Sequence, residues 1–454
     1  MKNIIPPSLR KYLQMSKRER KYEMQSTLWY MPLLYVSSSV VLVVLTLILD
    51  LTLDIEQYTP DILHIDEDIT RMLVSTLIGG ILTLSAFTLN SLLVVLTTFS
   101  GQFSPRMLLN FVADKRTQHA LGVFNGSFVY VLLVFLFIGS TQLEFFVAVP
   151  ITTIFLAFLT AMTFIYFINH ATTWMQVHNI TNTMKENSQK IIRETLSEDL
   201  EVFRAASPGD LMKDQQEEFI TITAFKNGYI QLADYRAMIQ KAREDNIILQ
   251  FHVRTGDFIL KGNRLFSYWG PGAEEVDIKN YTKLIQIGHK ELELQDIHMG
   301  MNKLAEIAIK SLGNNDPKTA VTTIHQMAEL MLAVEDYITF TPYLKDKNEQ
   351  VRVILVKETF ESYLYRGFGL IRYYAKNDFI ILTEIIGSMK RLAGSLDQSK
   401  HEVLWEFSSN ILEQVDPYQS YRLDLRFMLD SLHQLSEVTG YEEEYKKIEA
   451  SLTH

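Results

Sequence analysis

Cysteine is absent from all 454 residues of the chain. Without a thiol the protein has no disulfide, no thiolate nucleophile and no cysteine-based metal centre. Positive charge is also scarce, because 43 Lys and Arg residues stand against 53 Asp and Glu residues. A nucleic-acid-binding domain needs a clustered basic surface. We therefore expect no nucleic-acid partner.

A third absence concerns charge of either sign. The segment from Met72 to Pro105 runs for 34 residues without Asp, Glu, Lys, Arg or His. Roughly 20 apolar residues are enough to cross a bilayer. Three further segments of the first 180 residues are similarly poor in charge. The sequence therefore predicts an integral membrane protein, in contact with the lipid bilayer, with four transmembrane helices at 28–49, 70–99, 120–140 and 145–168.

The charges between these helices predict their orientation. Basic residues crowd the segment before the first helix and recur between the second and third, at Arg106, Lys115 and Arg116. The loop between the first and second helices carries seven acidic residues: Asp50, Asp54, Glu56, Asp61, Asp66, Glu67 and Asp68. Loops rich in Lys and Arg stay in the cytoplasm. Both termini are therefore predicted to be cytoplasmic.

Composition divides the chain into five predicted regions. A basic cytosolic N-terminus (1–27) and a four-helix transmembrane domain (28–179) are followed by a linker or stalk helix (180–210). Short β-prone runs then predict a small β module (211–290), and helical periodicity predicts a C-terminal helical bundle (291–454). The fold class is thus membrane α-helical, followed by a cytosolic α+β region. Since only histidines interrupt residues 145–184, we also expect one rod of about 60 Å joining the fourth span to the stalk.

The β module contains a phrase from Arg254 to Leu265, with Gly256, Asp257 and Gly262, that resembles the turn-and-strand phrase of lipoyl-like and efflux-adaptor barrel-sandwich modules. Lipoyl and biotinyl carriers hold their group on a Lys at a hairpin tip, and no Lys stands in that position here. The resemblance implies a barrel-sandwich-like scaffold without a cofactor. Arg254, Asp257 and Lys261 are interpreted as surface charges of a hairpin.

Four phrases in the same order are similar to those of a family of predicted bacterial integral membrane proteins classed as a domain of unknown function. They are Gln102–Arg106, Gly228-Tyr229-Ile230-Gln231, Gly256-Asp257-Phe258 and Asn315–Ala320. The resemblance covers nearly the whole chain and implies a multi-pass protein of the bacterial plasma membrane. The chain departs from the expected pattern at Thr255, where a Pro-Gly-Asp turn is expected, and at Leu294–Ile297. The resemblance supplies no catalytic or ligand-binding residue.

The second span carries a polar stripe. Its members recur every seventh residue and so share one helix face, with two large apolar side chains among them. One interpretation is that this face packs against neighbouring spans. The other is that several subunits place the face around a central pore, with hydroxyls and an amide as lining and the apolar pair as a constriction. The pore-lining candidates are Thr76, Thr83, Asn90 and Thr97, and the constriction candidates are Phe87 and Val94.

Charge next to the stripe leaves the permeant ion open. Acidic residues on the outer side would concentrate cations, whereas Arg106, Lys115 and Arg116 at the cytosolic mouth would concentrate anions. Both sets are also explained by topology alone. We expect no metal site and no cofactor, although three smaller groups have a functional alternative: a cation site at His64, Asp66 and Asp68, a proton-sensing pair at His170 and His178, and an anion site at the helix start 315–319.

The sequence contains no nucleophile elbow, phosphate-binding loop, zincin motif or dinucleotide fingerprint, so we expect no enzyme. The first hypothesis is an oligomeric, channel-like pore with a cytosolic regulatory domain. The alternative is a non-conducting membrane scaffold or sensor, whose cytosolic domain binds a partner or a small ligand.

Overall fold

The chain is described here by a computed structural model. It describes residues 30–53, 55–102, 114–139, 143–174, 176–196, 200–212, 219–289, 291, 297–413 and 421–453. The chain divides into two compact units, Met1–Val177 and His178–His454. We call them the membrane unit and the C-terminal unit and describe each by itself.

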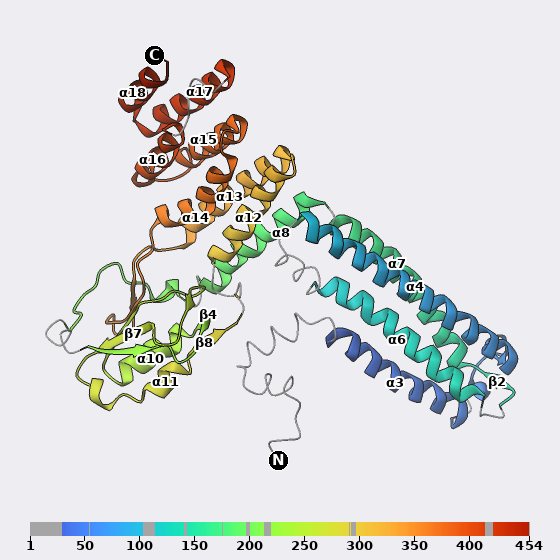
Figure 1. Cartoon of the computed structure of the whole chain (residues 1–454). Helices are drawn as coiled ribbons and strands as arrows, with labels where there is room; N and C mark the ends of the chain where they lie inside the picture. Colours follow the sequence, from blue (N-terminus) through green and yellow to red (C-terminus); the bar gives the residue numbers. More distant parts are fainter. Residues whose placement is uncertain are drawn as a thin grey trace. The chain divides into compact units, whose positions relative to one another are not determined.

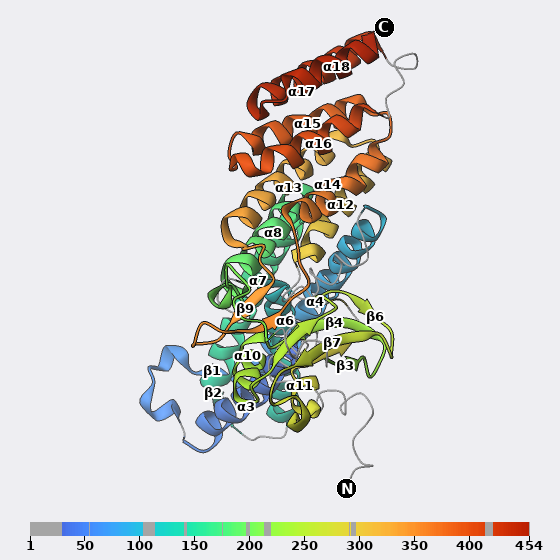
Figure 2. The same ribbon diagram turned by 90° about the vertical axis from the view of Figure 1, so that its left-hand side faces the viewer.

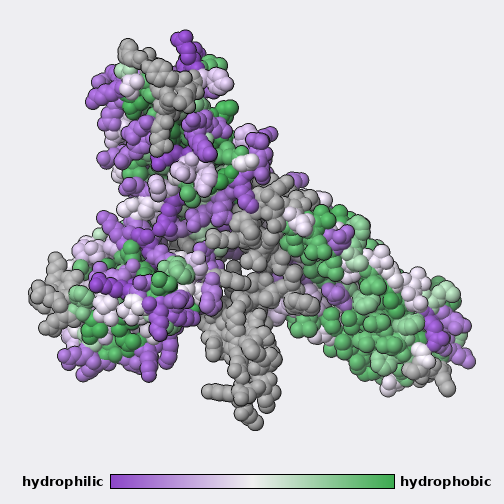
Figure 3. Space-filling model, viewed as in Figure 1, coloured by the Kyte–Doolittle hydropathy of each residue, from purple (hydrophilic) through white to green (hydrophobic). Residues whose placement is uncertain are grey.

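Four helices of the membrane unit are long and apolar enough to cross a membrane. This confirms the four predicted spans. Large apolar side chains cover the outside of these helices, as Figure 3 shows for the face in view. The helices, labelled in Figure 1, are α3 (Tyr30–Leu51), α4 (Glu67–Gln102), α6 (Lys115–Ile138) and α7 (Ala148–Trp174). Between them lie two short 3-10 helices, Ile55–Tyr58 and Asp61–Leu63, and the strand pair β1 (Ile65–Asp66) and β2 (Phe145–Phe146).

Helices α3 and α6 approach each other closely where α6 has no side chain. A Cβ atom added to Gly126 would lie 2.9 Å from Oγ of Ser39 and 3.2 Å from the carbonyl oxygen of Tyr35. One turn further on, the hydroxyl of Tyr130 donates a hydrogen bond of 3.2 Å to that of Thr46. Small residues permit such an approach between membrane helices. The glycine therefore sets the spacing of this helix pair.

Asp50 joins the end of α3 to the start of α7. Its carboxylate accepts hydrogen bonds from the backbone N–H groups of Val147, Ala148 and Val149, at 3.3, 2.8 and 2.9 Å. The residue is only 6% exposed. An anion is favoured at a helix N-terminus, where N–H groups lack partners. Asp50, counted in the sequence among the acidic residues of an outer loop, thus has a structural role.

The predicted single rod from the fourth span into the stalk is wrong. Helix α7 ends at Trp174, and a separate helix, α8 (Val177–Lys190), continues as a short π-helix over Ile191–Leu196. Helix α8 packs within the C-terminal unit, where Nζ of Lys185 lies 2.5 Å from Oε2 of Glu329. The second span forms a longer helix than the predicted 70–99, because α4 has 36 residues, about 54 Å at the usual rise.

Two sheets form the β part of the C-terminal unit, visible in Figure 2. The larger has the order β3-β7-β5-β10-β9, in which β5 and β10 are parallel, and the smaller has the order β6-β4-β8. The strands are β3 (Ile220–Thr223), β4 (Gly228–Ala233), β5 (Ile248–Phe251), β6 (Phe258–Ile259), β7 (Arg264–Trp269), β8 (Ile285–Gly288), β9 (Tyr343–Lys345) and β10 (Val351–Ile354). Because β9 and β10 belong to the larger sheet, the sheet extends beyond the predicted limits of the module, 211–290.

Helices complete the unit. A short 3-10 helix, Glu201–Phe203, precedes the sheets, and α10 (Tyr235–Glu244) and α11 (Ile278–Thr282) lie among the strands. Two helices separate β8 from β9, and Asp316 caps the second by accepting a hydrogen bond of 3.1 Å from the N–H of Thr319. This agrees with the helix start predicted within 315–319. The long helices are α12 (Ile297–Gly313), α13 (Pro317–Tyr337), α14 (Phe360–Ala375), α15 (Phe379–Ala393), α16 (His401–Leu412), α17 (Arg422–Thr439) and α18 (Glu442–Thr453).

Candidate functional site

The polar stripe of α4 points away from the other helices of the membrane unit. Thr76, Thr83, Asn90 and Thr97 are all exposed, and Phe87 and Val94 keep 55% and 51% of their surface. The buried side of α4 is formed by other residues: Val74, Ile81, Thr88, Leu92 and Val95. The polar residues of the stripe are therefore not buried by the chain's own described spans.

The stripe satisfies most of its polar groups within α4 itself. The hydroxyls of Thr76, Thr83 and Thr97 donate to backbone carbonyls of the preceding turn, at 2.8, 2.8 and 2.9 Å. The amide of Asn90 has no hydrogen bond of this kind among the described residues. At one edge of the stripe, Phe87 meets Phe164 of α7, with ring centroids 5.8 Å apart.

Two of the three basic residues predicted for the cytosolic mouth are described. Lys115 and Arg116 are exposed at the start of α6, and Arg106 lies outside the described residues. Beside them Asp114 caps the N-terminus of α6. Its carboxylate also lies 2.6 Å from Nε2 of His170 on α7. His170 is thus paired with a carboxylate. His178, its predicted partner in proton sensing, belongs to the other unit.

The predicted cation site in the outer loop does not come together in the described residues. Nδ1 of His64 lies 4.0 Å from carboxylate oxygens of Glu56 and Asp61. Asp66 instead accepts a hydrogen bond from the backbone N–H of Asp68. The described part of the chain contains no group of three metal-ligating side chains.

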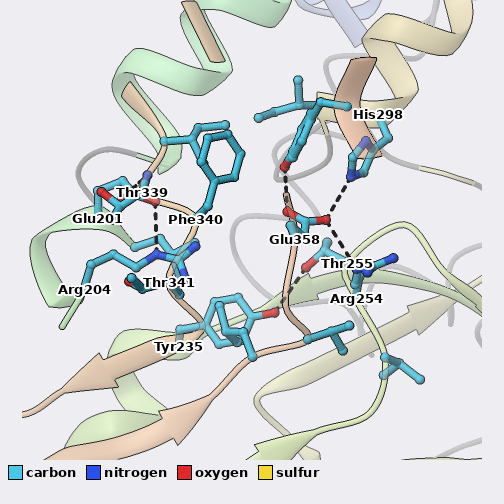
Figure 4. A pocket seen from close by; sticks show the side chains of 17 residues that line it. Glu201, Arg204, Tyr235, Arg254, Thr255, His298, Thr339, Phe340, Thr341 and Glu358 are labelled. Atoms are coloured by element: carbon cyan, nitrogen blue, oxygen red, sulfur yellow. Dashed lines mark hydrogen bonds and ion pairs between the residues drawn. The ribbon is translucent and has the colours of Figure 1, made fainter. Parts of the chain in front are cut away.

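The C-terminal unit contains a pocket that the sequence did not indicate. It lies where the loop after β5, the start of α12, the segment between α13 and β9, and the segment between β10 and α14 meet. Its cavity volume is about 90 Å³, several times the roughly 10–15 Å³ that one water needs. Figure 4 shows two groups of charged side chains on opposite sides of this pocket.

Glu358 is the centre of the first group. Its Oε1 atom lies 2.9 Å from Nε2 of His298 and 3.3 Å from Nε of Arg254, and its Oε2 atom accepts a hydrogen bond of 2.6 Å from the hydroxyl of Tyr363. Burial by itself would raise the pKa of the Glu358 carboxyl. The hydrogen bond and charge of His298, together with Tyr363 and Arg254, outweigh burial and lower this pKa below its ordinary value.

Arg204 and Glu201 form the second group. Nε of Arg204 donates to Oε1 of Glu201 at 3.2 Å, and its Nη1 donates to the backbone carbonyl of Thr341. The other oxygen of Glu201 accepts a hydrogen bond of 2.9 Å from the backbone N–H of Thr339. The hydrogen bonds to Thr339 and Thr341 therefore tie the segment that contains Glu201 and Arg204 to the segment between α13 and β9.

Aromatic and hydroxyl groups line the pocket between the two charged groups. The ring of Phe340 and the ring of Tyr235 both line it, and the Tyr235 hydroxyl lies 3.4 Å from that of Thr255. Burial raises the pKa of the Tyr235 hydroxyl, so this group stays neutral. The hydroxyl of Thr341 is buried and has no hydrogen-bond partner among the described residues. The pocket thus combines hydrogen-bond donors, a buried hydroxyl without a hydrogen-bond partner in the described residues, and aromatic rings.

Sequence reasoning missed most of this site. Arg254, interpreted as a surface charge of a hairpin, is 29% exposed and contacts Glu358, more than 100 residues away along the chain. No local pattern distinguishes Glu358 or His298 from other charged helix-end residues. One signal was present, because Arg254 and Thr255 adjoin the Gly256-Asp257-Phe258 phrase that carries the family resemblance.

Together, these features define a class: a membrane protein with four candidate spans and a second unit that holds a polar pocket. A family described as "Predicted membrane protein (DUF2254)" matches residues 25–391, which is more than half of the chain. The chain belongs to this family. The match includes every residue of the stripe and of the pocket.

Similar proteins include the uncharacterized proteins Rv1290c of Mycobacterium tuberculosis and Mb1321c of Mycobacterium bovis. Each is 24% identical over 308 residues, which is 65% of this chain and 58% of the relative. The match therefore spans less than two thirds of the length of these relatives. No solved structure matches the chain.

Proposed function

We propose that several copies of the chain assemble in the bacterial plasma membrane with the α4 stripe turned toward a shared interior, forming a channel-like pore. One observation carries this proposal. The stripe is polar, lies on an apolar span, and is exposed on the outside of the single membrane unit. An amide such as that of Asn90 is costly in hydrocarbon unless it finds a partner or water.

The surface beside the stripe suits close contact between helices. A Cβ atom placed on Gly79 or Gly80 would meet nothing within 4 Å, and Ser75 and Thr76 are exposed on neighbouring turns. Small residues let membrane helices approach closely. A second copy of α4 can therefore lie against this edge, while Thr83 and Asn90 face the interior that the copies share.

In this assembly the termini and the C-terminal unit are cytosolic, as the distribution of basic residues favours. Lys115 and Arg116 stand at the cytosolic mouth, and ions are the candidate permeants. The C-terminal unit regulates the pore and catalyses no reaction. The pocket is the part of that unit best suited to receive a signal.

The second candidate is a non-conducting membrane-anchored sensor. The pocket favours it, because a site for a small ligand needs no pore to be useful. In this case the spans anchor the protein, and the stripe is an interface between copies or with another membrane protein.

The cysteine-free sequence provides a direct test. Single cysteines at Thr83 and Asn90 in nanodiscs or native membranes are expected to form covalent dimers with a thiol crosslinker. The matched control is Val41→Cys, since Val41 is 58% exposed on the outside of α3. Crosslinking at all three positions alike, or at none, contradicts the assembly.

Conduction is tested separately in liposomes. Ion flux is expected to fall when Asn90→Leu removes the amide, and to change when Phe87→Ala widens the constriction. Crosslinking at Asn90 without any flux from the unsubstituted protein favours the sensor over the pore.

A further inference from the structure

We infer that the pocket of the C-terminal unit binds a small organic anion, and that the guanidinium groups of Arg204 and Arg254 supply the positive charge that recognises its carboxylate or phosphate. This inference rests on the proposed role of the unit as the part that receives a signal. It does not depend on whether the membrane unit conducts.

The carboxylates of the pocket are already satisfied. Oε1 of Glu358 is paired with His298 and, in an ion pair, with Arg254, and its Oε2 accepts from Tyr363. The two oxygens of Glu201 accept from Arg204 and from a backbone N–H group. A carboxylate whose two oxygens already meet protein donors and whose charge is paired with a guanidinium offers less to a cationic ligand. The pocket is therefore poorly suited to an ammonium group or a metal ion.

The guanidinium groups of Arg204 and Arg254 have N–H donors that no protein acceptor uses in the described residues. Each has five N–H donors in a fixed plane. Arg204 donates from Nε and Nη1, and Arg254 donates from Nη2 to the carbonyl of Lys357 at 3.1 Å, while its buried Nε has no hydrogen-bond partner in the described residues. Within the described residues, the remaining N–H groups have no protein acceptor. Planar forks of this kind match the geometry of carboxylate and phosphate oxygens.

Thr341 gives an independent indication. Its hydroxyl is buried next to the Arg204 group and lacks a hydrogen-bond partner in the described residues. A buried hydroxyl is usually paired, so one without a partner suggests a group that is supplied from outside the chain. A ligand oxygen near Arg204 would accept this hydrogen bond.

The pocket walls indicate the rest of the ligand. Tyr235, Phe340 and Leu355 line the space between the charged groups, and the cavity is small. Ligand sites combine such apolar walls with a few polar groups that fix orientation. A compact anion with a short apolar or aromatic body fits this description, whereas a polyanion or a long acyl chain does not.

The test uses the full chain in nanodiscs, titrated with sodium benzoate and, separately, with inorganic phosphate by calorimetry and by thermal shift. At least one probe is expected to bind, with lower affinity at high salt. Benzoate alone indicates a carboxylate head, and phosphate alone a phosphate head. Binding of neither probe overturns the inference.

Variants then locate the binding. Arg204→Gln and Arg254→Gln are each expected to weaken binding at least tenfold, and Thr341→Val about threefold. The matched control Arg264→Gln, at an exposed position on β7, should bind like the unsubstituted chain. Equal affinity in all four variants overturns the inference.

Thr341→Val also distinguishes a loss of ligand binding from a loss of folding. Because the Thr341 hydroxyl has no partner in the described protein, an isosteric valine is expected to leave the unliganded thermal midpoint unchanged or higher. A variant that folds normally and binds less tightly supports the site. Flux is measured on the same preparations, so a failed pore and a failed ligand site give different results.

Discussion

The two units satisfy their polar side chains in different ways. In the membrane unit, threonines of the spans donate to carbonyls of their own helix, and longer-range polar contacts are found chiefly near helix ends, as at Asp50 and Asp114. In the C-terminal unit, charged side chains far apart in the sequence meet in one pocket, as Glu358 and Arg254 do. Hydrocarbon penalises an unpaired polar group more than water does, so a span relies on partners nearby. The exposed amide of Asn90 departs from this rule.

The largest expected effect is at Asp50. Asp50→Ala leaves three backbone N–H groups at the start of α7 without their acceptor, and we expect it to cost about 3 kcal/mol of unfolding free energy. Unfolding in detergent micelles measures the loss. Asp61→Ala is the control, because the Asp61 side chain is fully exposed. Equal stability of the two variants would show that the long-range contact at the helix end does not hold the membrane unit together.

Two glycines of the membrane unit are expected to respond oppositely. Gly126→Ala forces α3 and α6 apart and should cost about 1–2 kcal/mol, by the overpacking effect. Gly80→Ala meets open space in the single chain and should leave unfolding unchanged or slightly improved. In the cysteine-crosslinking assay, however, adding Gly80→Ala to the Thr83→Cys variant should reduce the yield of covalent dimer. If it does not, the edge at Gly80 is not a contact between copies.

The pocket predicts a pH dependence of stability. Because the pKa of the Glu358 carboxyl is lower in the folded unit than its ordinary value of 4.5, the ionised form stabilises the fold above that value. This contribution is lost as the pH falls through the lower, folded pKa. The thermal midpoint should therefore fall as the pH is lowered below about 5, and Glu358→Gln should make the fall shallower. Parallel curves for the two proteins would contradict the prediction.

The smallest expected effect is at the contact between α8 and α13. Lys185 and Glu329 form an ion pair, but the Glu329 side chain is 52% exposed. An exposed pair contributes little, so Lys185→Ala should cost about 0.5 kcal/mol. A double-mutant cycle with Glu329→Ala isolates the coupling between the two charges. A coupling above about 2 kcal/mol would show that α8 is held by this pair and not by its buried apolar side chains.

Much of the fold could be predicted from local pattern. The four spans were predicted because hydropathy is a property of consecutive residues, and the start of α13 because Asp316 and Pro317 act on the first turn that follows them. The stripe of α4 was also predicted as a single face, since it needs only the period of a helix. Which way that face points was not predictable, and the structure turns it outward.

The sequence by itself determined the membrane class, the helix positions and the stripe, because each depends on residues within a few turns of one another. Only the tertiary structure decided that Asp50 caps α7, that the fourth span and the stalk are separate helices, and that a pocket exists. The pairing of β5 with β10 brings the segments after these strands, with Arg254 and Glu358, to the same end of the sheet. Charges that meet across 100 residues of chain leave no periodic trace, because their partners are selected by packing and not by spacing.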